Sequence, residues 1–171
     1  TVKAVYNPEN IKGKEVVETR VISLDAGSQL NKTVVTYDNL AEPTQVVAGV
    51  VLHNPLDECR YIASAEKGYL AYADPTDNVN NNNGTIYVGC VFPEAVAEAK
   101  PVMYEEPEKT QLRGGADGQL LAYIDYTPGS ELVYYWGSGW SKYGFDTDET
   151  WNTYIQNAAV AKRNPLQVTL K

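Results

Sequence analysis

Cysteine is scarce in this chain of 171 residues, which contains only Cys59 and Cys90. Two cysteines are too few for a disulfide-stabilised scaffold, and neither lies at a metal-binding spacing from the single histidine. Two alternatives stay open for them, one disulfide in an oxidising compartment or two buried free thiols. A chain of this length buries about 70% of its unfolded surface on folding, so we expect one domain that needs no cross-links.

Long hydrophobic runs and an excess of positive charge are also absent. No segment approaches the roughly 20 consecutive apolar residues of a membrane-spanning helix, and no secretory leader precedes the first strand pattern, so we expect a mature or trimmed product without a membrane span. Fourteen Lys and Arg residues face 22 Asp and Glu residues, which gives a formal net charge of −8. Because such a surface repels polyphosphates, we expect no nucleic-acid partner.

Motifs for nucleotides, metals and activated serines are missing as well. The sequence has no Walker loop, no nucleophile-elbow serine and no zinc-binding helix motif. We therefore predict no cofactor and no metal ion. The residues Asp74, Asp77, Asn78 and Asn80 carry the oxygen ligands that calcium prefers, but their spacing departs from that of an EF-hand.

Alternation of apolar and polar residues predicts strands through most of the chain. Turn residues separate these strands, as at Asp25–Ser28, where we expect a hairpin. The predicted strands are Val17–Leu24, Gln29–Tyr37, Gln45–His53, Arg60–Ala65, Tyr69–Ala73, Thr85–Phe92, Gln119–Tyr126, Glu131–Trp136 and Leu166–Leu170. Their spacing predicts a mainly β fold, an antiparallel β-sandwich with one C-terminal helix.

The C-terminal helix is predicted to begin after Thr147, a suitable N-cap that is followed by acidic residues. Trp151 and Ile155 then fall on one face, and Asn164–Pro165 ends the helix. A second, short apolar helix is predicted at Glu94–Ala99. The rest of Pro93–Gly118 is rich in Glu, Pro and Gly and predicts a long surface loop.

The segment Tyr134–Lys142 is the strongest candidate for ligand binding. We expect a strand to run here into a glycine-containing turn that carries Trp136 and Trp140. Flat aromatic faces stack on sugar rings, glycine permits close approach, and lysine favours an anionic ligand. The alternative is that Trp136 packs in the core and Trp140 covers the base of the helix. The sugar-binding interpretation makes five residues candidates for ligand contact: Arg20, Tyr135, Trp136, Trp140 and Lys142.

His53 is the candidate catalytic residue. It ends an apolar strand and faces a loop, and an imidazole titrates near neutral pH, as a general acid or base must. The alternative is a structural histidine whose ring bonds to a backbone carbonyl.

Several segments, taken together, resemble a known family. Arg20–Asn31 looks like a strand pair of galactose-mutarotase-like supersandwich domains. With Val47–His53, Tyr135–Lys142 and Arg163–Leu166, it resembles the family called domain of unknown function 4861. The resemblance implies an exported protein, periplasmic or extracellular, of polysaccharide-degrading bacteria such as Bacteroidetes. It also implies a role beside enzymes that process pectin and other uronic-acid glycans, with this chain corresponding to the C-terminal half of longer members.

Three functions remain open at this point. The first is a glycan-active enzyme in which His53 plays the histidine acid that the resemblance to mutarotases implies, although no residue matches the glutamate base of that superfamily by motif. The second is a non-catalytic carbohydrate-binding module, and the third is a structural domain whose tyrosines contact a protein partner. The oligomeric state is left open.

Overall fold

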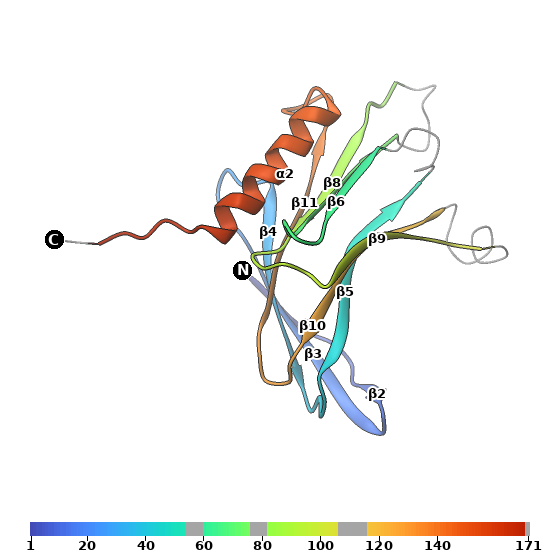
Figure 1. Cartoon of the computed structure of the whole chain (residues 1–171), viewed down its shortest axis with the longest axis vertical. Helices are drawn as coiled ribbons and strands as arrows, with labels where there is room; N and C mark the ends of the chain where they lie inside the picture. The colour runs from blue at the N-terminus through green and yellow to red at the C-terminus, as the bar shows by residue number, and fades with distance from the viewer. Residues whose placement is uncertain (54–59, 76–81, 106–115, 170–171) are drawn as a thin grey trace.

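The computed structural model describes residues 1–53, 60–75, 82–105 and 116–169, which form two antiparallel sheets and one helix (Figure 1). The larger sheet contains, in spatial order, β1 (Val2–Val5), β3 (Lys14–Leu24), β4 (Leu30–Asp38), β11 (Leu132–Trp140), β8 (Ile86–Val91), β7 (Tyr69–Asp74) and β6 (Tyr61–Ser64), with β2 (Glu9–Ile11) paired to β3. The smaller sheet contains β5 (Thr44–Leu52), β10 (Gly118–Tyr126) and β9 (Glu98–Met103). The helix α2 spans Asp148–Arg163. The predicted β-sandwich with a C-terminal helix is therefore confirmed.

The larger sheet is the middle layer of the protein, and each of its faces has its own core. On one face, Tyr87 of β8 packs with Trp151 and Ile155 of α2. On the other face, Leu70 and Cys90 pack with side chains of the smaller sheet. Consecutive strand residues point to opposite faces, so a single strand such as β8 supplies both cores.

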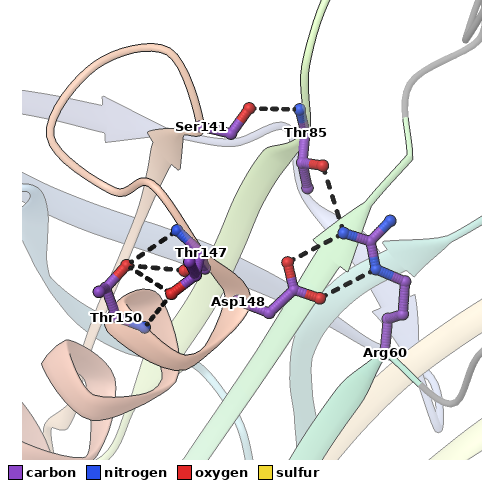
Figure 2. Close-up of polar contacts among 6 residues, drawn as sticks. All are labelled: Arg60, Thr85, Ser141, Thr147, Asp148 and Thr150. Carbon is purple, nitrogen blue, oxygen red and sulfur yellow. Dashed lines mark hydrogen bonds and ion pairs between the residues drawn. The ribbon is translucent and has the colours of Figure 1, made fainter.

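The helix begins as the sequence predicts. The Thr147 hydroxyl accepts a hydrogen bond from the Thr150 N–H at 3.2 Å, and the Thr150 hydroxyl accepts one from the Thr147 N–H at 3.2 Å (Figure 2). This reciprocal pair satisfies two backbone donors that a helix N-terminus leaves open. The basic residues Lys162 and Arg163 occupy the last turn, where they complement the helix dipole. Among the described residues, no helix is both long and apolar enough to cross a bilayer.

Two predictions of secondary structure are wrong, one between β8 and β10 and one in the C-terminal tail. The short helix expected at Glu94–Ala99 is absent, because the chain instead enters β9 at Glu98 and pairs with β10. Pairing with a neighbouring strand outweighs the helical preference of alanine and glutamate, and Pro101 is tolerated because β9 is an edge strand. Residues 166–169 do not form the expected final strand, and Leu166 is 95% exposed.

The strand β11 is longer than predicted. Gly137 and Gly139 were expected in a turn, but both lie within the strand, which continues to Trp140. A Cβ atom on Gly137 would lie 1.9 Å from the Gln29 carbonyl oxygen, and one on Gly139 would lie 2.6 Å from the ring of Phe145. Glycine is required at these two positions for close packing, not for a turn.

Candidate functional site

Alternation along β11 divides its side chains between the two faces of the larger sheet. Tyr134 packs in the core between the sheets, whereas Tyr135 packs against the core beneath α2. With a period of two, Trp136, Ser138 and Trp140 share the face of Tyr134. Both candidate indoles therefore point to the side of the smaller sheet, away from α2.

A cavity of about 670 Å³ lies over this face of β11. The larger sheet contributes Arg20 from β3 and Trp136 from β11, and residues 47–50 of β5 form the opposite wall. Arg20 and Trp136 were both predicted as ligand contacts, and the fold brings them to one cavity although 116 positions separate them in the sequence.

A second cavity of about 560 Å³ adjoins the first and is lined by Trp140 and Lys142. Gln29 and Ser138 line both cavities, so the two cavities are neighbours along β11. We call the two together the β11 groove. It contains four of the five residues that the sequence predicts as ligand contacts.

Both indoles are partly exposed and held in fixed orientations. Trp136 is 39% exposed, and its Nε1–H donates to the Oγ1 atom of the fully buried Thr33 at 2.8 Å. Trp140 is 42% exposed, and its Nε1–H donates to the Asn83 carbonyl oxygen at 2.8 Å. Because the polar edge of each ring already has a partner, the exposed part of each ring is apolar surface. Neither ring is sealed in the core.

The charges in the β11 groove are all positive. Arg20 forms an ion pair with Glu18, and its guanidinium lies 4.9 Å from the centre of the Tyr6 ring. The Lys142 ammonium donates to the Asn82 carbonyl oxygen. Although the chain has 22 acidic residues, the described residues that line the groove include no Asp or Glu. Among the described lining residues, Arg20 and Lys142 therefore carry the charges of the groove, and Glu18 offsets that of Arg20.

Tyr135 is the predicted contact that the structure places elsewhere. Its ring faces α2, and the ammonium of Lys162 lies 4.4 Å from the ring centre. This geometry is a cation–π contact between the sheet and the end of the helix. Tyr135 is next to Trp136 in the sequence, but adjacent residues of a strand point to opposite sides.

His53 lies just after β5 and has a carboxylate partner, not the backbone carbonyl of the structural alternative. Its Nδ1 atom is 2.8 Å from Oδ2 of Asp74. The His53 N–H donates to the Tyr72 hydroxyl at 3.1 Å, and that hydroxyl donates to the His53 carbonyl oxygen. The Tyr72 hydroxyl thus fixes the backbone of the histidine, while Asp74 orients its ring.

The pair formed by His53 and Asp74 and the ring of Trp140 lie at the same end of the larger sheet. Asp74 is directly opposite Ile86 in the β7–β8 register, and Ile86 lines the groove beside Trp140. Asp74 is therefore two strands away from β11, a distance of about 10 Å between strand axes. His53 is not among the described residues that line the groove.

A polar network that the sequence does not reveal fixes the start of α2 to this end of the sheet (Figure 2). The guanidinium of Arg60 donates to both carboxylate oxygens of Asp148, at 2.9 and 3.0 Å, and to the Thr85 hydroxyl at 3.2 Å. The Ser141 hydroxyl accepts from the Thr85 N–H at 2.8 Å. The network holds the segment after β11, which carries Lys142. The hydrogen bonds from Arg60 lower the pKa of the Asp148 carboxyl.

Asp148→Asn is expected to lower stability in a pH-dependent way. Because the pKa of Asp148 is lower in the folded protein than in the unfolded chain, its contribution is complete above the unfolded value of about 3.9. It is lost as the pH falls through the folded value. We expect a loss of roughly 0.5–1 kcal/mol at pH 7, as for a partly exposed ion pair, and a smaller difference below pH 4. Urea unfolding at pH 3 to 7 measures this.

Glu149→Gln is the matched control, because Glu149 lies in the same first helical turn. It shares the favourable position near the helix N-terminus but not the contact with Arg60. An equal loss of stability in the two variants would show that the helix dipole, and not the Arg60 network, accounts for the effect.

Some sequence predictions fall on residues outside the structural description. Cys59, Asp77, Asn78 and Asn80 are among them, so of the four residues with calcium-type oxygen ligands only Asp74 is placed, and it pairs with His53. Cys90 is a buried free thiol, and burial raises its pKa to about 12. In the part of the chain that the structure covers, no three His, Cys, Asp or Glu side chains form a cluster that would hold a metal ion.

Comparison with known proteins identifies one family. The family model described as Domain of unknown function (DUF4861) matches residues 1–168, which is nearly the whole chain. No curated protein and no solved structure matches the chain. The resemblance to galactose-mutarotase-like supersandwich domains stays a prediction. The match over residues 1–168 is sufficient to conclude that the chain belongs to the DUF4861 family.

Proposed function

We propose that the β11 groove binds an acidic oligosaccharide, as part of an exported protein that handles fragments of uronic-acid-containing polysaccharides. The observation that supports this most is the combination of two partly exposed indoles, Trp136 and Trp140, with a lining in which Arg20 and Lys142 are the only charged side chains among the described residues.

The chemistry of the groove fits each part of such a ligand. The apolar face of a sugar ring stacks on an indole, and the sugar hydroxyls hydrogen-bond to amide side chains. Gln29 and Asn31 line the groove and supply such amides. The carboxylate of a uronate pairs with a guanidinium or an ammonium group. A neutral glycan would use the rings but not the two cations.

Trp140→Ala is expected to weaken the binding of galacturonic acid oligomers. Stacking of a planar ring on an aromatic side chain contributes about 1–3 kcal/mol in nucleic-acid complexes, which corresponds to a loss of roughly 5- to 150-fold in affinity. Isothermal titration calorimetry of wild type and variant measures the difference. Tyr123→Ala removes an aromatic ring from the smaller sheet, outside the groove, and is expected to leave the affinity unchanged.

The charge preference is tested with the same oligomers and with neutral glucose oligomers of equal length. Wild type is expected to prefer the acidic series at low salt, and Lys142→Ala is expected to reduce that preference. Lys100→Ala is the control, since Lys100 pairs with Glu98 outside the groove. Equal affinity of the wild type for the two series, or an unchanged affinity in Trp140→Ala, would contradict the proposal.

A second candidate function is proton transfer by His53 on a bound glycan. The 2.8 Å contact with Asp74 favours it, because an imidazole that donates from Nδ1 to a carboxylate presents its other nitrogen as a base. If this protein is a glycan-active enzyme, His53→Ala abolishes turnover and spares oligosaccharide affinity. If the imidazole is structural, His53→Ala changes neither quantity.

A further inference from the structure

We propose that the β11 groove recognises a chain of at least three sugar units that lies along β11, and not a single sugar. This inference rests on the proposed function and adds the length of the ligand. The two indoles act as separate stacking positions, one at Trp136 and one at Trp140.

The spacing of the two indoles along β11 favours a separate sugar ring for each indole. Trp136 and Trp140 are four residues apart on one strand, which places their Cα atoms about 13 Å apart. Both side chains leave the same face of β11, so the two indoles are successive positions along the strand, and a sugar ring stacked on one of them leaves the other uncovered. Two adjacent rings, joined through a single oxygen, also lie too close together. A ligand that covers both indoles therefore contributes a third ring between them.

The two cavities of the groove meet between the indoles. Ser138 lies midway between the two indoles on the same face of β11, and it lines both cavities. Its small side chain leaves room for the intervening sugar ring and offers a hydroxyl for hydrogen bonding. Gln29, which directly precedes β4, also borders both cavities. The middle of the groove therefore has two uncharged polar side chains among its described residues, Gln29 and Ser138.

The ends of the groove share a second property, a positive charge near each indole. Arg20 lines the cavity that contains Trp136, and Lys142 lines the cavity that contains Trp140. The two described residues that line both cavities, Gln29 and Ser138, are uncharged. A chain with carboxylates on its terminal units therefore fits the charge distribution better than a single charged sugar does.

The rings are also prevented from moving toward each other. The Nε1–H of Trp136 is bonded to Thr33, and that of Trp140 is bonded to Asn83. A shorter ligand cannot draw both indoles onto itself without breaking one of these bonds. The separation of the two stacking positions is therefore part of the folded structure before a ligand arrives.

Titration with galacturonic acid oligomers of one to six units tests the length requirement. Wild-type affinity is expected to rise by roughly tenfold or more between the dimer and the tetramer, as a second ring gains an aromatic partner. Trp136→Ala and Trp140→Ala are each expected to remove this step while retaining weak binding of the monomer. Circular dichroism confirms that each variant is folded.

Ser138→Leu provides an independent arm, because it fills the middle of the groove and leaves both indoles in place. It is expected to weaken the tetramer and to leave the monomer unaffected. If monomer and tetramer bind wild type equally well, the length requirement is wrong and the proposed function stands. If no uronate binds at any length, the proposed function itself is wrong, and this inference fails with it.

Discussion

Trp151→Ala is expected to lower the free energy of unfolding by about 3–5 kcal/mol, the range measured when a buried tryptophan is replaced by alanine. Trp151 is fully buried between α2 and the larger sheet. Its ring stacks on Tyr87 at 6.0 Å and meets the edge of Phe145 at 4.9 Å, and its Nε1–H donates to the Val88 carbonyl oxygen at 3.1 Å. The variant loses these contacts together and leaves a large cavity.

Urea unfolding at neutral pH measures this loss, with Trp140→Ala as the matched control. Trp140 is 42% exposed at the surface of the groove, so its removal is expected to cost less than about 1 kcal/mol. Because the free energy of unfolding of a domain is about 5–15 kcal/mol, we expect Trp151→Ala to keep a folded state whose stability is strongly reduced. Similar losses in the two variants would mean that α2 is not anchored to the sheet through Trp151.

Leu120→Ala is expected to cost about 2–5 kcal/mol, because Leu120 is fully buried between the two sheets. The adjacent Leu121 supplies a stringent control. It lies on the opposite face of β10, where side chains are only partly buried, and Leu121→Ala is expected to cost less than half as much. Thermal and urea unfolding of both variants measure the difference. The reverse order of the two losses would require a register shift of one residue in β10.

Alternation in the sequence predicts most of the strands because their two faces differ in burial. It locates each strand from β3 to β8, and both β10 and β11, within a few residues. It misses β1, β2 and β9, which are short or lie at the edge of a sheet. At these positions the chain forms a strand because it pairs with a neighbouring strand. In β9, for example, Glu98 pairs with Tyr123 of β10, which is distant in the sequence.

The candidate site is predictable where the chemistry resides in the side chain itself. Trp136, Trp140 and Lys142 are conspicuous as two indoles and a cation within one short segment, and the structure places them along one groove. Because a turn was expected at Gly137, the sequence did not predict that Trp136 and Trp140 lie on the same face of one strand. With β11 recognised as continuous to Trp140, alternation alone would have placed Tyr135 on the opposite side.

Partners that lie far apart in the sequence are beyond this kind of prediction. Asp74 is 21 residues from His53, and Asp148 is 88 residues from Arg60. Nothing in the local pattern distinguishes these carboxylates from the other acidic residues of the chain. Only the packing of the smaller sheet on β7 and the packing of α2 on the larger sheet bring them into contact with their partners.

The division of β11 between two layers restricts how this strand can vary. Even-numbered positions from Tyr134 to Trp140 serve the groove, and the intervening positions serve the helix. Inserting or deleting one residue before Trp136 would turn both indoles toward α2 and present glycines to a ligand. Changes in chain length are therefore tolerable in this strand only in steps of two, whereas ligand preference is free to diverge by substitution at alternate positions.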